Sequence, residues 1–336
     1  MKALLTNNKG RLWLADVTVP AIGDYECLVK MEACLFCHTT DQHIVDGTFV
    51  CGFQDPSILG HESVGIVEKT GAKVRHLKPG DRVLRVYSVY PGQKHDDCGS
   101  AWGGFAEYGK VTDWQAMLDD GKLEGGKVPM PYMQKVPADI PFEKSLLMIP
   151  MKEIYSASRK VGEIKGRSFL VAGAGVTGCM FGMFLKADGA ARVTLAARRR
   201  DPLEFALRHK VADDTLLLDG TSQPATYDTL IDTTGSMETM RKLADSALKP
   251  AGQVCSYAVY DGMSKPGFFD GLAAQHKFQR IDPAEATAHD AVCERLRNGS
   301  IDASPFLTAR FGINDWEKAW ASVRNRTSLK TAIMFG

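Results

Sequence analysis

A glycine-rich turn between two apolar segments constrains the fold of this chain more than any other feature. The turn reads Gly173-Ala174-Gly175-Val176-Thr177-Gly178; it follows the apolar run at residues 169–172 and opens an apolar helix at residue 179. Strand, glycine turn and helix in this order form a dinucleotide-binding βαβ unit, whereas the same glycines in another context are an ordinary loop. The free amides at the start of the helix favour phosphate binding. We assign cofactor contacts to Gly173, Gly175, Val176, Thr177 and Gly178.

The residues after the next strand indicate which dinucleotide binds. An acidic residue about 20 positions past the turn would hold a ribose 2′-hydroxyl and favour NAD. The predicted strand at residues 192–196 instead ends in Ala197-Arg198-Arg199-Arg200. Guanidinium groups bind phosphate through bidentate hydrogen bonds, so Arg198, Arg199 and Arg200 favour NADP, with NAD as the second choice. The alternative is that Arg199 and Arg200 belong to a solvated turn.

The pattern of apolar segments divides the chain into two kinds of domain. Short β-like runs separated by turn residues predominate up to residue 110, and strands alternate with helices from residue 165 onward. Such alternation is typical of a doubly wound parallel sheet. The last stretch leaves the alternation and is expected to return to the first domain. We therefore predict an α/β protein with a β-rich domain at residues 1–147, a dinucleotide-binding domain at residues 148–282 and a C-terminal return at residues 283–336.

Composition argues against several classes of partner. The 336 residues include 41 Lys and Arg against 40 Asp and Glu, a formal net charge of +1, so there is no general field for nucleic acid or an anionic membrane. No apolar run approaches the roughly 20 residues that span a bilayer, and the N-terminus lacks the apolar segment of a secretory signal. We expect a cytoplasmic protein with a small-molecule partner, and we interpret its 8 cysteines as reduced thiols.

The first domain carries a second motif, Gly60-His61-Glu62-Ser63-Val64-Gly65, followed by Gly71 and Val74. With this motif and the glycine turn, the chain resembles the zinc-containing medium-chain alcohol and polyol dehydrogenases of the sorbitol and glucose dehydrogenase type. The segment Lys330-Thr331-Ala332-Ile333 is similar to the end of the family's C-terminal return. The resemblance implies a GroES-like catalytic domain built from both ends of the chain, a Rossmann domain between them, and assembly as a homodimer or homotetramer.

The resemblance also implies one catalytic zinc. In the family, a cysteine from the loop before the motif and the histidine of the motif hold the metal, and here these are Cys37 and His61. A catalytic zinc needs three protein ligands, and Glu62 is the natural third in polyol-type members. Asp41 resembles the acid that orients the histidine. Taken singly, a cysteine or histidine is more often structural, so the assignment rests on their joint occurrence; Cys34 is interpreted as a buried strand residue.

One extra residue separates the cysteine from the hydroxyl that the family uses to relay a proton. The family's hydroxyl lies two positions after the cysteine, whereas Thr40 lies three positions after Cys37. The relay hydroxyl is therefore Thr40 or Thr39, and the proton then passes to His43, which exchanges it with solvent. His38 is a rival of Cys37 for the metal.

Two further departures concern metal ligands. Many members hold a structural zinc with four clustered cysteines, but the corresponding segment here has only Cys98, so no structural zinc is expected. The family's additional Glu or Cys ligand stands 24 residues before the glycine turn; that position is Ile149, whose alkyl group cannot bind zinc. Glu153, one turn later on a helix that Pro150 starts, is a candidate for this role and for contact with the nicotinamide. The alternative is that Lys152 and Glu153 form a solvated pair.

These features predict an NAD(P)-linked alcohol dehydrogenase or ketone reductase that transfers hydride between a secondary alcohol and the nicotinamide, with zinc as a Lewis acid. The loop at residues 87–103 is polar, and with Glu62 and Glu107 it favours a sugar, polyol or cyclitol-like alcohol or ketone as substrate. Ile149 and the distorted cysteine motif leave open a zinc-free, NADPH-dependent medium-chain reductase. A non-catalytic NADPH-binding protein is the third interpretation.

Overall fold

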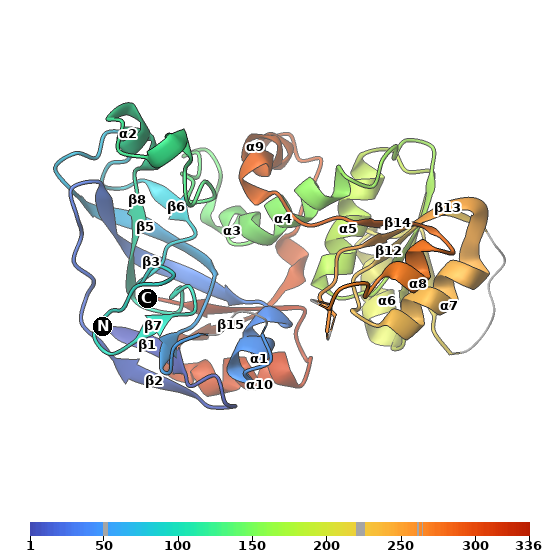
Figure 1. Cartoon of the computed structure of the whole chain (residues 1–336), viewed down its shortest axis with the longest axis horizontal. Coiled ribbons are helices and arrows are strands. Elements are labelled where there is room, and N and C mark those ends of the chain that lie inside the picture. Colours follow the sequence, from blue (N-terminus) through green and yellow to red (C-terminus); the bar gives the residue numbers. More distant parts are fainter. Residues whose placement is uncertain (50–52, 220–225, 261, 264) are drawn as a thin grey trace. The chain divides into compact units, whose positions relative to one another are not determined.

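The computed structural model of the chain describes residues 1–49, 53–219, 226–260, 262–263 and 265–336. These residues divide into two units, whose elements are labelled in Figure 1. Unit 1 consists of Met1–Ile149 and Phe306–Gly336, and unit 2 of Pro150–Pro305. Both ends of the chain therefore belong to unit 1, and the unit that carries the glycine turn is inserted between them.

Unit 1 contains two β-sheets. The strand order is β2-β1-β4-β7 in the first sheet and β15-β16-β3-β5-β6 in the second, where β8 also pairs with β3. The long antiparallel pair β3 and β5 forms the centre of the second sheet, and most residues of β3 are buried. The strands are β1 (Lys2–Thr6), β2 (Leu12–Asp16), β3 (Glu26–Phe36), β4 (Ser57–Ile58), β5 (Glu62–Thr70), β6 (Arg82–Leu84), β7 (Gly99–Ser100), β8 (Tyr108–Thr112), β15 (Leu307–Gly312) and β16 (Lys330–Met334).

The C-terminal segment completes the core of unit 1. Helix α10 (Trp316–Arg324) packs Trp320 against Phe36, with ring centroids 5.6 Å apart, and Phe36 in turn lies 4.2 Å from the Phe105 ring. Strand β16 pairs antiparallel with β3, so the last strand of the chain lies next to one of the first. The other helices of this unit are α1 (Thr40–Val45), α2 (Trp114–Asp119) and α3 (Phe142–Ser145), with 3-10 turns at Glu124–Gly126 and Ile313–Asp315.

Unit 2 is built on a parallel sheet of six strands in the order β11-β10-β9-β12-β13-β14. In chain order this is 3-2-1-4-5-6, the order of a doubly wound dinucleotide-binding fold. The central strands are buried along nearly their whole length, as in sheets that are covered on both faces. The predicted α/β class with a doubly wound sheet is confirmed. The strands are β9 (Ser168–Ala172), β10 (Arg192–Ala197), β11 (Asp214–Leu217), β12 (Tyr227–Asp232), β13 (Leu248–Ser256) and β14 (Lys277–Arg280).

Helix boundaries in unit 2 set the positions of several predicted site residues. Helix α4 (Met148–Ser158) begins before Pro150, which fits the first turn because the amide that proline lacks has no helical partner there. Helix α6 (Arg200–Arg208) begins directly after β10. No helix in the described part of the chain is long and apolar enough to span a membrane. The remaining helices are α5 (Val176–Ala187), α7 (Met237–Ala247), α8 (Asp270–Ala273) and α9 (His289–Arg297), with 3-10 turns at Glu285–Ala288 and Ser304–Phe306.

Candidate functional site

Adjacent strands bring together the three predicted metal ligands. Cys37 follows the end of β3, and Glu62 begins β5. The antiparallel register places Leu35 opposite Glu62, so the two strand ends meet. One ligand atom from each of Cys37, His61 and Glu62 lies within 4.8 Å of the other two. Among the described residues, this is the one group of three such side chains that lie this close together.

A turn that requires glycine positions His61. Gly60 has a φ of +107°, and a Cβ at this position would lie 2.6 Å from the Phe105 ring. Its carbonyl accepts a 2.7 Å hydrogen bond from the Gly104 amide. The chain that enters His61 therefore lies directly against the segment before β8, and glycine alone fits there.

Asp41 contacts two of the three candidate ligands, Cys37 and His61. Its Oδ2 accepts a 2.8 Å hydrogen bond from the Cys37 amide, and its Oδ1 lies 3.2 Å from His61 Nδ1. The second contact is an ion pair rather than a well-directed hydrogen bond. Burial lowers the pKa of His61, but the Asp41 carboxylate outweighs that effect and raises the pKa to about 10. With Nδ1 beside Asp41, the ring presents Nε2 to a cation, whose binding would displace the imidazolium proton.

A buried lysine is the partner of the third ligand. Lys330 Nζ donates to Glu62 Oε1 at 2.6 Å, and the two side chains are only 3% and 2% exposed. Burial opposes the charge on Lys330, but the Glu62 carboxylate holds its pKa above the usual value. Glu62 Oε2 is buried and has no hydrogen-bond partner in the described part of the chain, a costly state unless a cation binds it. This oxygen, the Cys37 thiolate and the His61 imidazole form a donor set that fits zinc.

The other predicted residues of unit 1 lie on or beside helix α1. Thr40 begins the helix and is half-buried, whereas Thr39 precedes it and is exposed. His43 lies on the same helix, with Nδ1 2.7 Å from Thr48 Oγ1. The ligand group does not include His38, and burial, together with the Lys330 charge, lowers the pKa of this histidine to about 4.

Two other cysteines that the sequence singles out are buried thiols. Cys34 lies in β3, and Cys98 lies next to β7. Burial raises the pKa of both, most strongly for Cys34. Cys51 lies outside the described residues. Apart from Cys37, the cysteines that the structure describes are buried and pack like small apolar side chains.

Ile149 and Glu153 both lie on α4, one turn apart, as the sequence predicts. Ile149 is buried and offers no ligand atom, and Glu153 is not part of the ligand group in unit 1. The alternative, that Lys152 and Glu153 form a solvated pair, is wrong for Lys152. Lys152 is fully buried and pairs with Glu285 at 3.0 Å, because α4 packs this face into unit 2.

In unit 2, the glycine turn lies between β9 and α5 at the centre of the sheet. Gly173 has a φ of +107°, and a Cβ on Gly178 would lie 1.9 Å from the Gly173 carbonyl oxygen. A Cβ on Gly175 would meet no atom within 4 Å, so the space beside it is open. Val176 and Thr177 begin α5, and no side chain caps this helix end. The amides of the first turn are therefore suited to phosphate oxygens.

The three arginines lie where β10 passes into α6. Arg198, Arg199 and Arg200 are all exposed, and Arg199 lies 3.6 Å from Asp201. The register of β9 and β10 brings the ends of both strands to the same edge of the sheet. The arginines and the glycine turn consequently share this edge.

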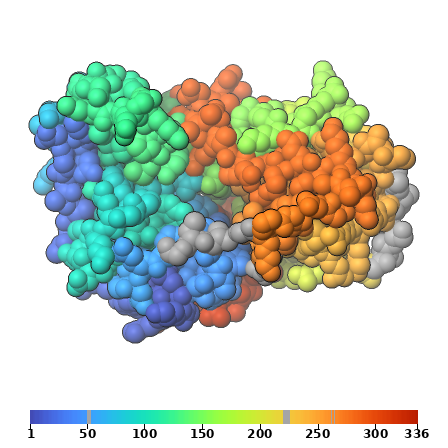
Figure 2. Space-filling model, viewed as in Figure 1, coloured from blue at the N-terminus to red at the C-terminus, as the bar shows by residue number. Residues whose placement is uncertain are grey.

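Within the polar loop at residues 87–103, the middle part at residues 91–97 is largely exposed at the surface of unit 1, in turquoise in Figure 2, whereas Tyr87 and Tyr90 are buried. His95 Nε2 lies 2.7 Å from the Thr18 carbonyl oxygen, and Asp96 accepts hydrogen bonds from the amide and hydroxyl of Thr18. Glu107 accepts a 2.7 Å hydrogen bond from the Lys2 amide. These hydrogen bonds hold the loop and β1 in place. The polar groups that form them therefore support a polyol substrate less than the sequence suggests.

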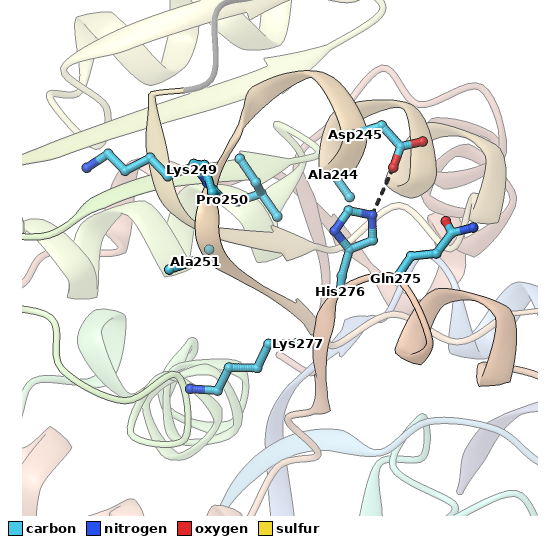
Figure 3. A pocket seen from close by; sticks show the side chains of 10 residues that line it. Ala244, Asp245, Lys249, Pro250, Ala251, Gln275, His276 and Lys277 are labelled. Atoms are coloured by element: carbon cyan, nitrogen blue, oxygen red, sulfur yellow. Dashed lines mark hydrogen bonds and ion pairs between the residues drawn. The ribbon is translucent and has the colours of Figure 1, made fainter.

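A cavity of about 310 Å³ lies elsewhere in unit 2, beside the ends of α7 and β14 (Figure 3). Its lining includes Asp245, His276 and Lys277, and His276 Nε2 lies 2.8 Å from Asp245 Oδ1. None of the site residues predicted from the sequence lines it. We therefore assign neither the metal nor the dinucleotide to this cavity.

Three residues beside the ligand group escape prediction from the sequence. Lys330 stands in the segment that resembles the family's C-terminal return, but nothing in that segment indicates its contact with Glu62. Arg85, with a φ of +59°, donates a 2.6 Å hydrogen bond from Nη1 to the His61 carbonyl. Trp102, with a φ of +67°, places its ring 5.1 Å from the His61 ring. No local motif marks either residue.

Comparison with known proteins finds similarity to alcohol and polyol dehydrogenases. Residues 23–119 match the alcohol dehydrogenase GroES-like domain. The chain is 26% identical to D-arabinitol dehydrogenase 1 of Uromyces fabae, over 99% of this chain and 97% of that protein. It is 32% identical to sorbitol dehydrogenase of Homo sapiens, a match that spans 57% of this chain and 54% of that protein. The structure of alcohol dehydrogenase TADH from Thermus sp. ATN1 shares the fold, with a TM-score of 0.80, 21% identity and 99% of each chain covered.

Proposed function

We propose that this chain, which is similar to alcohol and polyol dehydrogenases, transfers hydride between a secondary alcohol of the sugar, polyol or cyclitol type and NADP, with one zinc ion. The observation that carries the proposal is Glu62. One of its oxygens is held by Lys330, and the other is buried without a partner among the described residues, beside Cys37 and His61. The D-arabinitol and sorbitol dehydrogenases named above support the substrate class.

Zinc bound there supplies a Lewis acid that lowers the pKa of the substrate hydroxyl. The side chains of Cys37, His61 and Glu62 would hold the ion, and three protein ligands are the number that a catalytic zinc needs. Asp41 keeps a proton on His61 Nδ1 and so directs Nε2 to the metal. Lys330 neutralises Glu62 and fixes its rotamer.

Helix α1 supplies the path for the substrate proton in this proposal. The half-buried Thr40 accepts the proton at Oγ1, with the exposed Thr39 as the alternative. The proton then passes to His43 at Nε2, because Nδ1 is held by Thr48. A histidine side chain at this position can exchange such a proton with solvent.

Unit 2 binds the cofactor in this proposal. The amides of Val176 and Thr177 bind the pyrophosphate, and the open space beside Gly175 lets the phosphates approach the backbone. Arg198, Arg199 and Arg200 bind the 2′-phosphate of NADP. NAD would leave these guanidinium groups without an anionic partner on the ribose, so it is the weaker cofactor.

The test combines metal analysis with replacement of one ligand. We expect about one zinc per chain in protein purified without chelator. Cys37→Ser should lose the zinc and the oxidation of polyols but retain NADPH binding, which depends on unit 2. Cys98→Ala, a buried thiol outside the ligand group, is the matched control and should keep both zinc and activity. A Cys37→Ser protein with full zinc content would contradict the proposal.

Ile149 favours one competing function, a zinc-free reductase that uses NADPH, because an alkyl group stands where the family has an additional ligand. Protein without zinc that still reduces ketones with NADPH would establish this alternative. Protein that binds NADPH but turns over no alcohol or ketone would instead be a binding protein.

A further inference from the structure

Three aromatic side chains form a wall beside the histidine of the ligand group. The ring centroids of Trp102 and His61 are 5.1 Å apart, and the ring planes are inclined by 56°. Phe53 and Phe49 contact the same indole, with centroids 5.5 and 6.0 Å away. Trp102, Phe49 and Phe53 are all half-buried, so this aromatic wall keeps accessible area.

The backbone holds Trp102 in a conformation that tryptophan rarely adopts. Its φ of +67° lies in the left-handed region, where a bulky side chain is strained and glycine is the relaxed choice. The neighbouring backbone enforces this geometry: the Gly103 amide donates to the Ile58 carbonyl at 3.0 Å, and the Gly104 amide donates to the Gly60 carbonyl at 2.7 Å. Strain that the surroundings maintain next to a candidate site points to a role for the side chain.

We infer that the aromatic wall makes the site selective for a secondary alcohol carried on a ring, such as a cyclitol or the ring form of a sugar, and that Trp102 determines this selectivity. The inference rests on the proposed function. The face of an indole ring is electron-rich, and the C–H groups on one face of a hydroxylated ring are its complement. A ring presents that face in its resting conformation, whereas an open-chain polyol loses rotational freedom to present it.

Several polar groups that the sequence offered for substrate recognition already have partners within unit 1. His95 and Asp96 are engaged by Thr18, and Glu107 is engaged by the Lys2 amide. The indole beside His61 is a half-buried aromatic group next to the ligands. Pockets of this kind use aromatic area for affinity and a few polar groups for orientation.

The experiment compares two polyols with six carbons and six hydroxyls each, the ring myo-inositol and the open-chain sorbitol. Values of kcat/KM with NADP are measured for zinc-loaded wild type, Trp102→Gly, Trp102→Phe and the control Trp13→Leu, whose tryptophan is half-buried elsewhere in unit 1. Binding of both polyols to the protein with NADPH is measured by calorimetry. Wild type should prefer the ring. Trp102→Gly should lose about tenfold in ring affinity, mainly through KM, with little change for sorbitol, and Trp102→Phe should lose less.

Each outcome separates this inference from the function on which it rests. A wild-type preference for sorbitol, or an equal loss for both polyols in Trp102→Gly, overturns the inference while the dehydrogenase assignment stands. Loss of zinc in both Trp102 variants also overturns it, because Trp102 would then only support the ligand group. Absence of turnover with every secondary alcohol, in protein that holds no zinc, refutes the proposed function itself.

Discussion

The buried pair of Lys330 and Glu62 allows a quantitative prediction. The side chains are 3% and 2% exposed, and Nζ lies 2.6 Å from Oε1. Lys330→Met keeps most of the volume but leaves a buried carboxylate without its counter-charge. Breaking a buried pair in this way costs about 3–5 kcal/mol. In a folding unit of the size of unit 1, this free energy corresponds to a fall in Tm of about 10 °C.

A double-mutant cycle on zinc-free protein isolates the pair. Lys330→Met and Glu62→Gln should each lower the Tm of unit 1, because each leaves one buried group without its partner. The double variant should be more stable than the two single losses of unfolding free energy, added together, would predict. The difference, the coupling energy of the pair, should be about 2–3 kcal/mol.

The control for this cycle is an exposed pair. Lys318 lies 2.7 Å from Asp315, but the two side chains are 73% and 50% exposed. Lys318→Met should therefore change stability by no more than about 1 kcal/mol. If Lys330→Met also melts within a degree or two of wild type, or if the two single losses simply add, Glu62 does not depend on Lys330 and the reasoning fails.

Three further predictions concern unit 2. Gly178→Ala should destabilise this unit and abolish NADPH binding, because its Cβ would lie 1.9 Å from a backbone oxygen. Gly175→Ala should fold normally and show only a weaker affinity for NADPH, measured by calorimetry. Replacing Arg199 and Arg200 with alanine should weaken NADPH binding about 10- to 100-fold and leave NADH binding nearly unchanged; an equal loss for both would contradict the assignment. Burial would raise the pKa of Asp228, but hydrogen bonds from a backbone amide and a lysine lower it to about 2. Its stabilisation is therefore present above the ordinary value of 3.8 and is lost as pH falls toward 2, so Asp228→Asn should cost about 1–2 kcal/mol at neutral pH and almost nothing near pH 2 in thermal melts.

Much of unit 2 could be predicted from the sequence because its signals are local. The turn from β9 to α5 depends on glycines whose missing side chains are required within a few residues, at Gly173 and Gly178. Strands β11 (Asp214–Leu217) and β14 (Lys277–Arg280) were not predicted. They are the two outer strands of the sheet, and each has only 4 residues, too few for a distinct strand pattern.

The candidate metal site was predictable only in part, for a different reason. Cys37, His61 and Glu62 lie close together in the sequence, and a motif marks them. Lys330 reaches Glu62 across 268 positions of the chain, through the pairing of β16 with β3 and of β3 with β5. Such long-range register is a property of the whole sheet, so the residues around Lys330 do not reveal it.

The loss of a ligand at Ile149 has a structural counterpart in unit 1. The three candidate ligands, together with Asp41 and Lys330, all lie on β3, α1, β5 and β16 or directly beside them. Their relative positions are therefore set by one sheet and its hydrogen bonds, without a contribution from α4. A carboxylate held at one oxygen by a buried lysine keeps its second oxygen fixed, which is what a ligand needs when no fourth protein group helps to retain the ion. On this argument Lys330 lets Glu62 serve as the third ligand of the proposed site without a side chain from position 149.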